Sequence, residues 1–106
     1  MRHLTPVELQ AYLEEAETAP LLLDVREPWE FHHAHIAGSQ LLPMGRLPAQ
    51  VEQLDPKQEI VVICHHGVRS QQVAFYLEHI GFERIINLAG GVDAWAREVD
   101  PAMPRY

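Results

Sequence analysis

The single cysteine of this chain, Cys64, ends an apolar run and opens a short loop whose residue types suit the binding of an anion. The loop contains Gly67, Arg69 and Ser70, and a helical pattern follows it. Backbone N–H groups and a helix N-terminus at such a loop favour the thiolate over the thiol, and the thiolate is the nucleophile. Cys64 is therefore a candidate covalent catalyst.

The rest of the loop is predicted to bind an anionic substrate. The residues expected to present main-chain amides as an anion nest are His65, His66, Gly67, Val68, Arg69 and Ser70. Gly67 allows backbone angles that a side chain would forbid. Arg69 adds a positive charge and a two-pronged donor for an oxyanion such as a sulfonate, and Ser70 can cap the next helix. The alternative is a buried structural cysteine, since free cysteine is among the most buried residue types.

The elements that must position this loop alternate between apolar strands and helices. Residues 21–25 and Ile60–Ile63 are apolar runs typical of strands covered on both faces; a short strand is expected at 40–42 and another strand at 84–88. This alternation predicts an α/β fold with a parallel sheet. Ligands of such sheets bind beyond the carboxyl ends of the strands, which is where Cys64 falls.

Helices are predicted between the strands. The first begins with Thr5 as its N-cap and Pro6 at its first position, and Glu8 closes a capping box. Further helices are expected at residues 28–35, 47–54, 73–80 and 92–99, with an irregular tail at 100–106. Leu77 and Ile80 are placed on the apolar face of their helix.

Composition limits the class of protein and its partners. A chain of 106 residues, 47% hydrophobic and 22% charged, predicts one globular domain over residues 1–106. The net charge of −7 repels phosphate backbones and argues against nucleic acid as a partner. One cysteine cannot form an internal disulfide. The first residues lack the apolar core of a signal peptide, and no apolar run is long enough to span a bilayer. A cytoplasmic protein without membrane contact is expected.

Several motifs together resemble those of the rhodanese domain family. In the first half they are Leu22-Leu23-Asp24-Val25-Arg26, Glu30-Phe31, His35-Ile36-Ala37-Gly38-Ser39 and Leu42-Pro43. In the second half they are the active loop, Cys64-His65-His66-Gly67-Val68-Arg69-Ser70, and the closing motif, Gly90-Gly91-Val92-Asp93-Ala94-Trp95. They occur in the family's order over nearly the whole chain. One departure is Ala34, where the family usually has glycine.

The resemblance implies a rhodanese-like three-layer α/β/α sandwich with a central, mainly parallel five-stranded sheet. It also implies a single-domain sulfurtransferase. Cys64 would attack the outer sulfur of a donor such as thiosulfate, form a persulfide and release sulfite, and cyanide or a thiol would then take the sulfur. The Cys64 persulfide would be the covalent intermediate, and neither a metal nor another cofactor would be required.

Two further residues have roles implied by the family. Arg26 would reach the rim of the pocket, and Asp24 would hold the surrounding loops by hydrogen bonds. The alternative for both residues is a structural ion pair at the end of a strand. With no second domain to cover it, the loop above Cys64 is expected to be open.

Other functions remain as alternatives at this point. One is a sulfur carrier that receives its sulfur on Cys64 from a protein donor, and another is a non-catalytic rhodanese-like module that binds a protein partner. Cys64 and Arg69 argue against the second, because modules of that kind often lack the cysteine. Four residues separate Cys64 from Arg69, whereas the related dual-specificity phosphatases of the cell cycle have five, so no phosphatase activity is expected.

The seven histidines do not predict a metal site. A metal needs ligands that converge, and neighbours in sequence point in different directions. His32 and His33 are expected at the surface, and His35 is expected to make a structural hydrogen bond in its turn. His65 and His66 can serve the loop through their amides alone.

Overall fold

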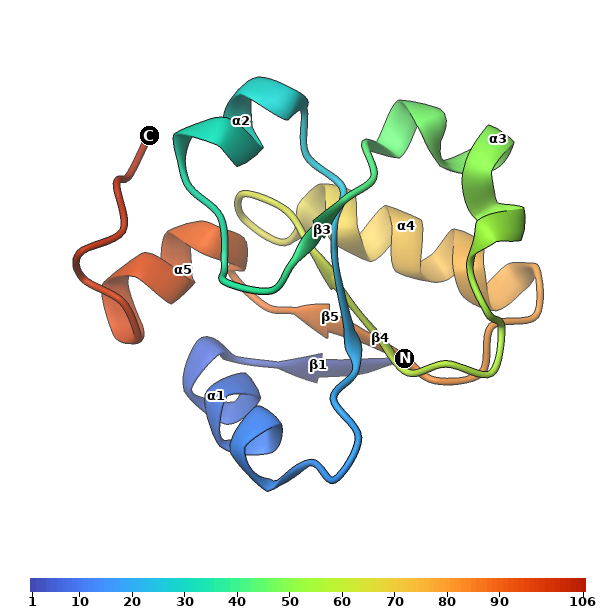
Figure 1. Ribbon diagram of the computed structural model, residues 1–106, viewed down its shortest axis with the longest axis horizontal. Coiled ribbons are helices and arrows are strands. Elements are labelled where there is room, and N and C mark those ends of the chain that lie inside the picture. The colour runs from blue at the N-terminus through green and yellow to red at the C-terminus, as the bar shows by residue number, and fades with distance from the viewer.

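Five parallel strands form the centre of the fold. The computed structural model describes residues 1–106, and its strands are β1 (Arg2–Leu4), β2 (Leu21–Asp24), β3 (Gln40–Leu41), β4 (Ile60–Ile63) and β5 (Ile85–Leu88). They lie in the order β1-β5-β4-β2-β3, and every neighbouring pair is parallel. Helices lie on both sides of this sheet (Figure 1). The predicted three-layer α/β/α sandwich is therefore confirmed, and its sheet is parallel throughout.

The central strand β4 carries the candidate nucleophile to the edge of the sheet. All four of its residues are fully buried, and it pairs with β2 on one side and β5 on the other. A continuous apolar run suits this position because both of its faces are covered. Cys64 follows directly at the carboxyl end of β4, as the sequence predicts.

The edge strand β1 is missing from the strands that the residue pattern predicts. It is three residues long, and only Leu4 is buried while Arg2 and His3 are exposed. An alternation this short gives no readable period. In the sheet, β1 pairs with β5 so that His3 lies beside Asn87.

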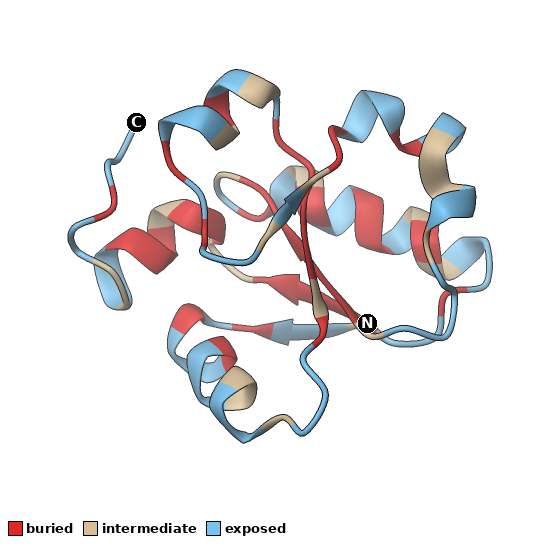
Figure 2. Ribbon diagram, viewed as in Figure 1, coloured by how far each residue is buried: buried red, intermediate tan, exposed pale blue.

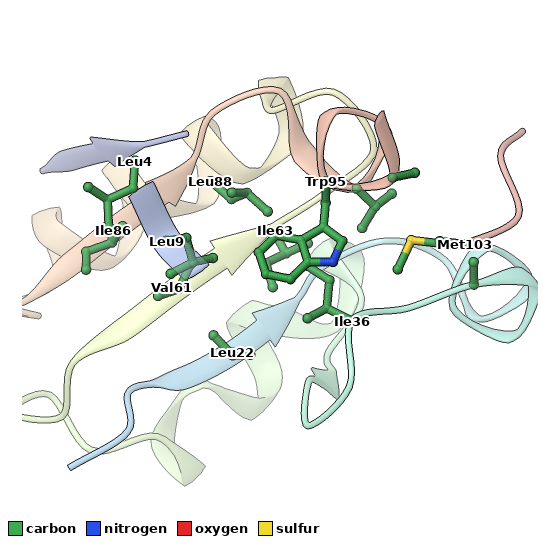
Figure 3. Packing of buried hydrophobic residues seen from close by; sticks show 13 residues of the cluster. Leu4, Leu9, Leu22, Ile36, Val61, Ile63, Ile86, Leu88, Trp95 and Met103 are labelled. Carbon is green, nitrogen blue, oxygen red and sulfur yellow. The ribbon is translucent and has the colours of Figure 1, made fainter. Parts of the chain in front are cut away.

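Helices α1 (Pro6–Glu15) and α5 (Gly91–Glu98) cover one face of the sheet. Leu9 of α1 and Trp95 of α5 pack with Ile63 and other strand residues in one hydrophobic cluster (Figure 3). The colouring by burial in Figure 2 shows the same arrangement, with buried residues on the sides of these helices that meet the sheet. The two helices therefore bury one of the two hydrophobic clusters, the one on their own face of the sheet.

The start of α1 follows its sequence closely. The hydroxyl of Thr5 accepts a hydrogen bond from the Glu8 amide at 3.2 Å, and the Glu8 carboxylate accepts one from the Thr5 amide at 2.9 Å. This reciprocal pair satisfies two N–H groups that the helix itself leaves free. The predicted capping box, with Pro6 in the first turn, is confirmed.

The other face of the sheet is covered by α4 (Val68–His79) and by a run of short turns. The single helix predicted over residues 47–54 is wrong. That region contains the 3-10 helix η1 (Met44–Arg46), the short α3 (Leu47–Gln50) and the 3-10 helix η2 (Val51–Gln53). The placement of Ile80 on an inner face is also wrong, because α4 ends at His79 and Ile80 is 41% exposed.

Helix α2 (Pro28–His33) is two residues shorter than predicted. Ala34 follows it in an extended conformation with φ at −167°, which any residue can adopt, so alanine is accommodated where the family usually has glycine. Residues 100–106 form turns and irregular chain, as predicted. None of the helices has the length and apolar character that crossing a bilayer requires.

Candidate active site

The active loop connects the end of β4 to the start of α4, at the carboxyl edge of the sheet (Figure 1). Gly67 is the residue immediately before α4 and has φ at +99°. This left-handed conformation is costly for a residue with a side chain. A Cβ atom on Gly67 would also lie 3.1 Å from the amide nitrogen of Gly90. Glycine is therefore required where the loop turns into the helix.

Two polar groups contact the sulfur of Cys64. The amide of Gly67 donates a hydrogen bond to Sγ at 3.1 Å, and Ser70 Oγ lies 3.3 Å from Sγ. Of the amides expected to converge, Gly67 is the one within hydrogen-bond distance. The sulfur lies at the N-terminal end of the twelve-residue α4, where N–H groups of the first turn have no partner within the helix. This end of a helix favours negative charge.

The expected open loop above Cys64 is wrong. Cys64 is only 1% exposed and packs within the apolar cluster beneath α4. The physical reason is that its sulfur turns inward to Ser70 and packs in one hydrophobic cluster with Val73 of α4. The sulfur thus combines a polar surrounding on one side with close packing on the other.

The start of α5 holds the active loop in place. The amide of Val92 donates to the Cys64 carbonyl at 2.9 Å, and the amide of Asp93 donates to the His65 carbonyl at 3.0 Å. Gly91 has φ at +60°, and a Cβ atom there would collide with both of these carbonyl groups. The sharp strand-to-helix turn predicted for the glycine pair is confirmed, and its closeness to the loop explains why a glycine is needed.

Arg69 is turned toward a carboxylate. Its Nη1 lies 2.6 Å from Glu30 Oε1, and its Nη2 lies 2.8 Å from Glu30 Oε2. The hydrogen bonds from Arg69 are the largest cause that lowers the pKa of Glu30 from 4.5 to about 2. The same bonds raise the pKa of Arg69. The two-pronged donor expected to face a substrate is thus occupied by Glu30 in this structure.

Arg26 forms the ion pair that was its alternative role. Its side chain is fully buried, with Nε 2.9 Å from Asp24 Oδ1 and Nη2 2.7 Å from Asp24 Oδ2. Nη2 also donates to the Ala34 carbonyl at 2.7 Å. Arg26 therefore offers no exposed atom at a pocket rim, whereas Asp24 fixes the chain between β2 and α2 through Arg26.

Tyr106 joins the two ion pairs, and no pattern in the sequence predicts this role. Its hydroxyl accepts from Arg26 Nη1 at 2.8 Å and donates to Glu30 Oε2 at 2.7 Å. Burial is the largest cause that raises the pKa of Tyr106 to about 12, so the phenol keeps its proton at neutral pH. The tail containing Tyr106 was expected only to be irregular. Glu30 belongs to the Glu30-Phe31 motif of the family, for which the sequence predicts no particular contact.

The two loop histidines lie beside each other. The rings of His65 and His66 are stacked with centroids 3.9 Å apart, and burial followed by the charge of His66 lowers the pKa of His65. Their nitrogens lie within 4.8 Å of a carboxylate oxygen of Asp93. That carboxylate is already paired with Arg97 and Arg105. Elsewhere, His35 Nδ1 is 2.9 Å from the Phe31 carbonyl, which confirms its structural hydrogen bond.

Asn87 of β5 is a further polar residue at the site. Its Oδ1 lies 2.5 Å from Ser70 Oγ, and its side chain is buried. The sequence signal was present, because a single amide interrupts the apolar strand Ile85–Leu88. Its position beside the sulfur depends on the packing of α4 against β5, which residue spacing does not reveal.

A fold and site of this kind define a class of protein. The family model for the rhodanese-like domain matches residues 5–98, and the chain belongs to that family. It is 39% identical over 80 residues to the thiosulfate sulfurtransferase GlpE of Tolumonas auensis, covering 76% of this chain and 74% of that protein. It is 35% identical over 99 residues to the rhodanese-like/PpiC domain-containing protein 12, chloroplastic, of Arabidopsis thaliana.

The match to the Arabidopsis protein covers 90% of this chain and spans about a third of that relative, 32% of its length. Among solved structures, the chain resembles SSP1007 of Staphylococcus saprophyticus with a TM-score of 0.84 and 30% identity. That match covers 93% of this chain and 97% of the other.

Proposed function

We propose that this chain is a sulfurtransferase that moves sulfane sulfur from thiosulfate to a thiophilic acceptor through a persulfide on Cys64. The observation that carries the proposal is the position of Sγ, which accepts a hydrogen bond from the Gly67 amide at the N-terminal end of α4. Such a position stabilises a sulfur anion. Membership of the rhodanese-like family and the likeness to a thiosulfate sulfurtransferase support the same activity.

The first step transfers one sulfur atom to the protein. The Cys64 thiolate attacks the outer sulfur of thiosulfate, a sulfur–sulfur bond forms, and the original sulfur–sulfur bond breaks with its electron pair leaving on sulfite. The product is a persulfide anion on Cys64. The amide of Gly67, the free N–H groups of Val68, Arg69 and Ser70, and the positive end of α4 would bind the anionic groups at each stage.

The second step returns the cysteine to its starting state. Cyanide or a thiolate attacks the terminal sulfur of the persulfide, and the electron pair of the broken bond returns to Cys64. With cyanide the product is thiocyanate. Sulfur itself is the group transferred, so neither step requires a cofactor or a metal. A reducing compartment such as the cytoplasm would keep the Cys64 thiol free for the next cycle.

In the loop, main-chain N–H groups would bind the anions, and the side chains would fix the loop in place. His65 and His66 follow Cys64 directly in the loop, and the side chain of His66 is 62% exposed. Since Glu30 occupies the guanidinium of Arg69, this arginine would contribute mainly by its N–H group and by fixing the loop. Arg26 and Asp24 would support the site from beneath it.

The test is the formation of thiocyanate from thiosulfate and cyanide. The full chain is expected to show turnover that depends on protein concentration, and Cys64→Ala is expected to show none above the uncatalysed rate. Val7→Ala, which changes an exposed side chain of α1, is the control and is expected to retain activity. If Cys64→Ala were as active as the unmodified chain, the proposal would be wrong.

A further inference from the structure

A chain of polar contacts leads from the candidate nucleophile to the surface. Ser70 Oγ is 3.3 Å from Cys64 Sγ, Asn87 Oδ1 is 2.5 Å from Ser70 Oγ, and Asn87 Nδ2 is 3.3 Å from His3 Nδ1. Cys64, Ser70 and Asn87 are buried, whereas His3 on the edge strand β1 is exposed. This series of contacts begins at the Cys64 sulfur and ends at the His3 ring, which is exposed and exchanges protons with water.

The direction of these hydrogen bonds is fixed by which atoms carry protons. Between Ser70 Oγ and Asn87 Oδ1, only the serine hydroxyl has a proton to donate. With its proton directed to Asn87, Ser70 offers a lone pair to the sulfur, so the contact with Sγ is made by a protonated thiol as the donor. This first arrangement stabilises the thiol of Cys64, and His3 Nδ1 accepts from the amide of Asn87.

The opposite direction arises when the amide of Asn87 turns over. Its Nδ2 then donates to Ser70 Oγ, and the serine hydroxyl is released to donate to a Cys64 thiolate. Asn87 Oδ1 now faces His3 and accepts a hydrogen bond from the N–H group at Nδ1. The thiol proton leaves to water, and the proton of the neutral His3 ring moves from Nε2 to Nδ1 by exchange with water, so the four residues together lose one proton. This second arrangement stabilises the thiolate.

We propose that Asn87 is a positioning residue for Cys64, whose two amide orientations direct the Ser70 hydroxyl and couple the thiolate to the tautomer of His3 that carries its proton on Nδ1. The inference rests on the proposed function only in taking Cys64 as the nucleophile. An amide is the side chain this role needs, because it carries a donor and an acceptor on opposite arms. It also explains why a buried polar group is placed in an otherwise apolar strand.

Other charged groups face the loop without joining this chain of contacts. They are the Arg69–Glu30 pair from α4 and α2, Asp93 from α5, and the rings of His65 and His66. None of them forms a hydrogen bond with Ser70 Oγ or with the Asn87 amide. The electric fields of these groups act on the Cys64 sulfur whether or not Ser70 Oγ is present. The effect of Asn87 on the sulfur passes through the Ser70 hydroxyl, so a Ser70→Ala background distinguishes the two.

The first test measures the rate of Cys64 alkylation by iodoacetamide against pH in a double-mutant cycle. Asn87→Asp places an acceptor-only carboxylate beside Ser70, which holds the hydroxyl away from the sulfur. Alkylation near pH 7 is expected to fall roughly tenfold, the effect of one hydrogen bond to a charged group. In the Ser70→Ala background the same substitution is expected to lower the rate several-fold less, because only the field of the added carboxylate then acts on the sulfur. Any other pattern, including equal changes in both backgrounds, would overturn the proposal.

The second test uses the chain without any substitution at Asn87. The ratio of the two neutral tautomers of His3 is followed by nitrogen NMR in alkaline solution, before and after carbamidomethylation of Cys64, with exposed His79 as the internal control. Coupling is reciprocal, so removing the thiolate is expected to shift His3 toward the tautomer with its proton on Nε2 and to leave His79 unchanged. An unchanged tautomer ratio at His3 would contradict the coupling. Neither test uses sulfur transfer, so failure here is distinct from failure to form thiocyanate.

Discussion

Arg69 and Glu30 form a two-pronged ion pair, with Nη1–Oε1 at 2.6 Å and Nη2–Oε2 at 2.8 Å. Arg69 belongs to the part of the active loop that forms the first turn of α4, and Glu30 is in α2. The Glu30 side chain is 4% exposed and that of Arg69 is 33% exposed. The pair thus ties the loop to a neighbouring helix and leaves main-chain N–H groups as the donors nearest to Cys64.

Replacing the carboxylate of this pair is expected to destabilise the protein. Glu30→Gln removes the charge that Arg69 and Tyr106 contact while keeping the size of the side chain. A loss of about 1–3 kcal/mol in the free energy of unfolding is expected from urea denaturation, the cost of leaving polar partners unsatisfied. Glu14→Gln, at an exposed position of α1, is the control. Equal stability of the two variants would contradict the assigned role of the pair.

The same pair predicts a loss of stability in acid. Contacts with Arg69 lower the pKa of Glu30 from 4.5 to about 2, so the folded state binds this proton less readily than the unfolded chain does. The stabilisation is fully present above pH 4.5 and is lost as the pH falls toward 2. The difference in unfolding free energy between the unmodified chain and Glu30→Gln is therefore expected to shrink over this window. A constant difference would show that Glu30 titrates normally.

Gly91 is expected to be intolerant of any side chain. Gly91→Ala would bring a Cβ atom against the carbonyl groups of Cys64 and His65 at a positive φ. The expected cost is about 1–3 kcal/mol of unfolding free energy from strain and overpacking, together with a lower rate of thiocyanate formation. Gly45→Ala is the matched control, because Gly45 has open space around it and no positive φ. If both variants were equally stable and active, the anchoring of the loop by α5 would be disproved.

The loop is expected to support no phosphatase activity. Four residues lie between Cys64 and Arg69, and the guanidinium of Arg69 is held by Glu30 instead of facing the loop. An aryl phosphate is therefore expected to show no turnover above the rate of Cys64→Ala, as measured by release of the phenol. Robust hydrolysis that disappears in Cys64→Ala would contradict this expectation.

The sequence predicted the features of the fold that depend on local patterns. The apolar run Ile60–Ile63, the Thr5 capping box and the position of Cys64 after β4 each follow from neighbouring residues, and the structure confirms them. The edge strand β1 was not predicted, because three residues are too few to show an alternation of apolar and polar side chains. The helix predicted over residues 47–54 failed because spacing alone cannot distinguish a continuous helix from consecutive short turns.

The site was predicted less fully than the fold, because its contacts join distant parts of the chain. The composition of the active loop predicts that amides between His65 and Ser70 surround the Cys64 sulfur, and in the structure the Gly67 amide is the one that contacts it. The partners of Arg69 and Ser70, which are Glu30 and Asn87, lie 39 and 17 residues away in the sequence. The tertiary structure determines which polar partner lies next to such a side chain, and the neighbouring residues in the sequence do not indicate which partner that is.

The most direct test of the account is the mass of the full chain after incubation with thiosulfate and removal of excess reagent. A persulfide on Cys64 is expected to add the mass of one sulfur atom, to disappear on addition of cyanide with release of thiocyanate, and to be absent from Cys64→Ala. An unchanged mass under conditions in which iodoacetamide still alkylates Cys64 would show a reachable thiol that accepts no sulfur, and would contradict the proposed transfer.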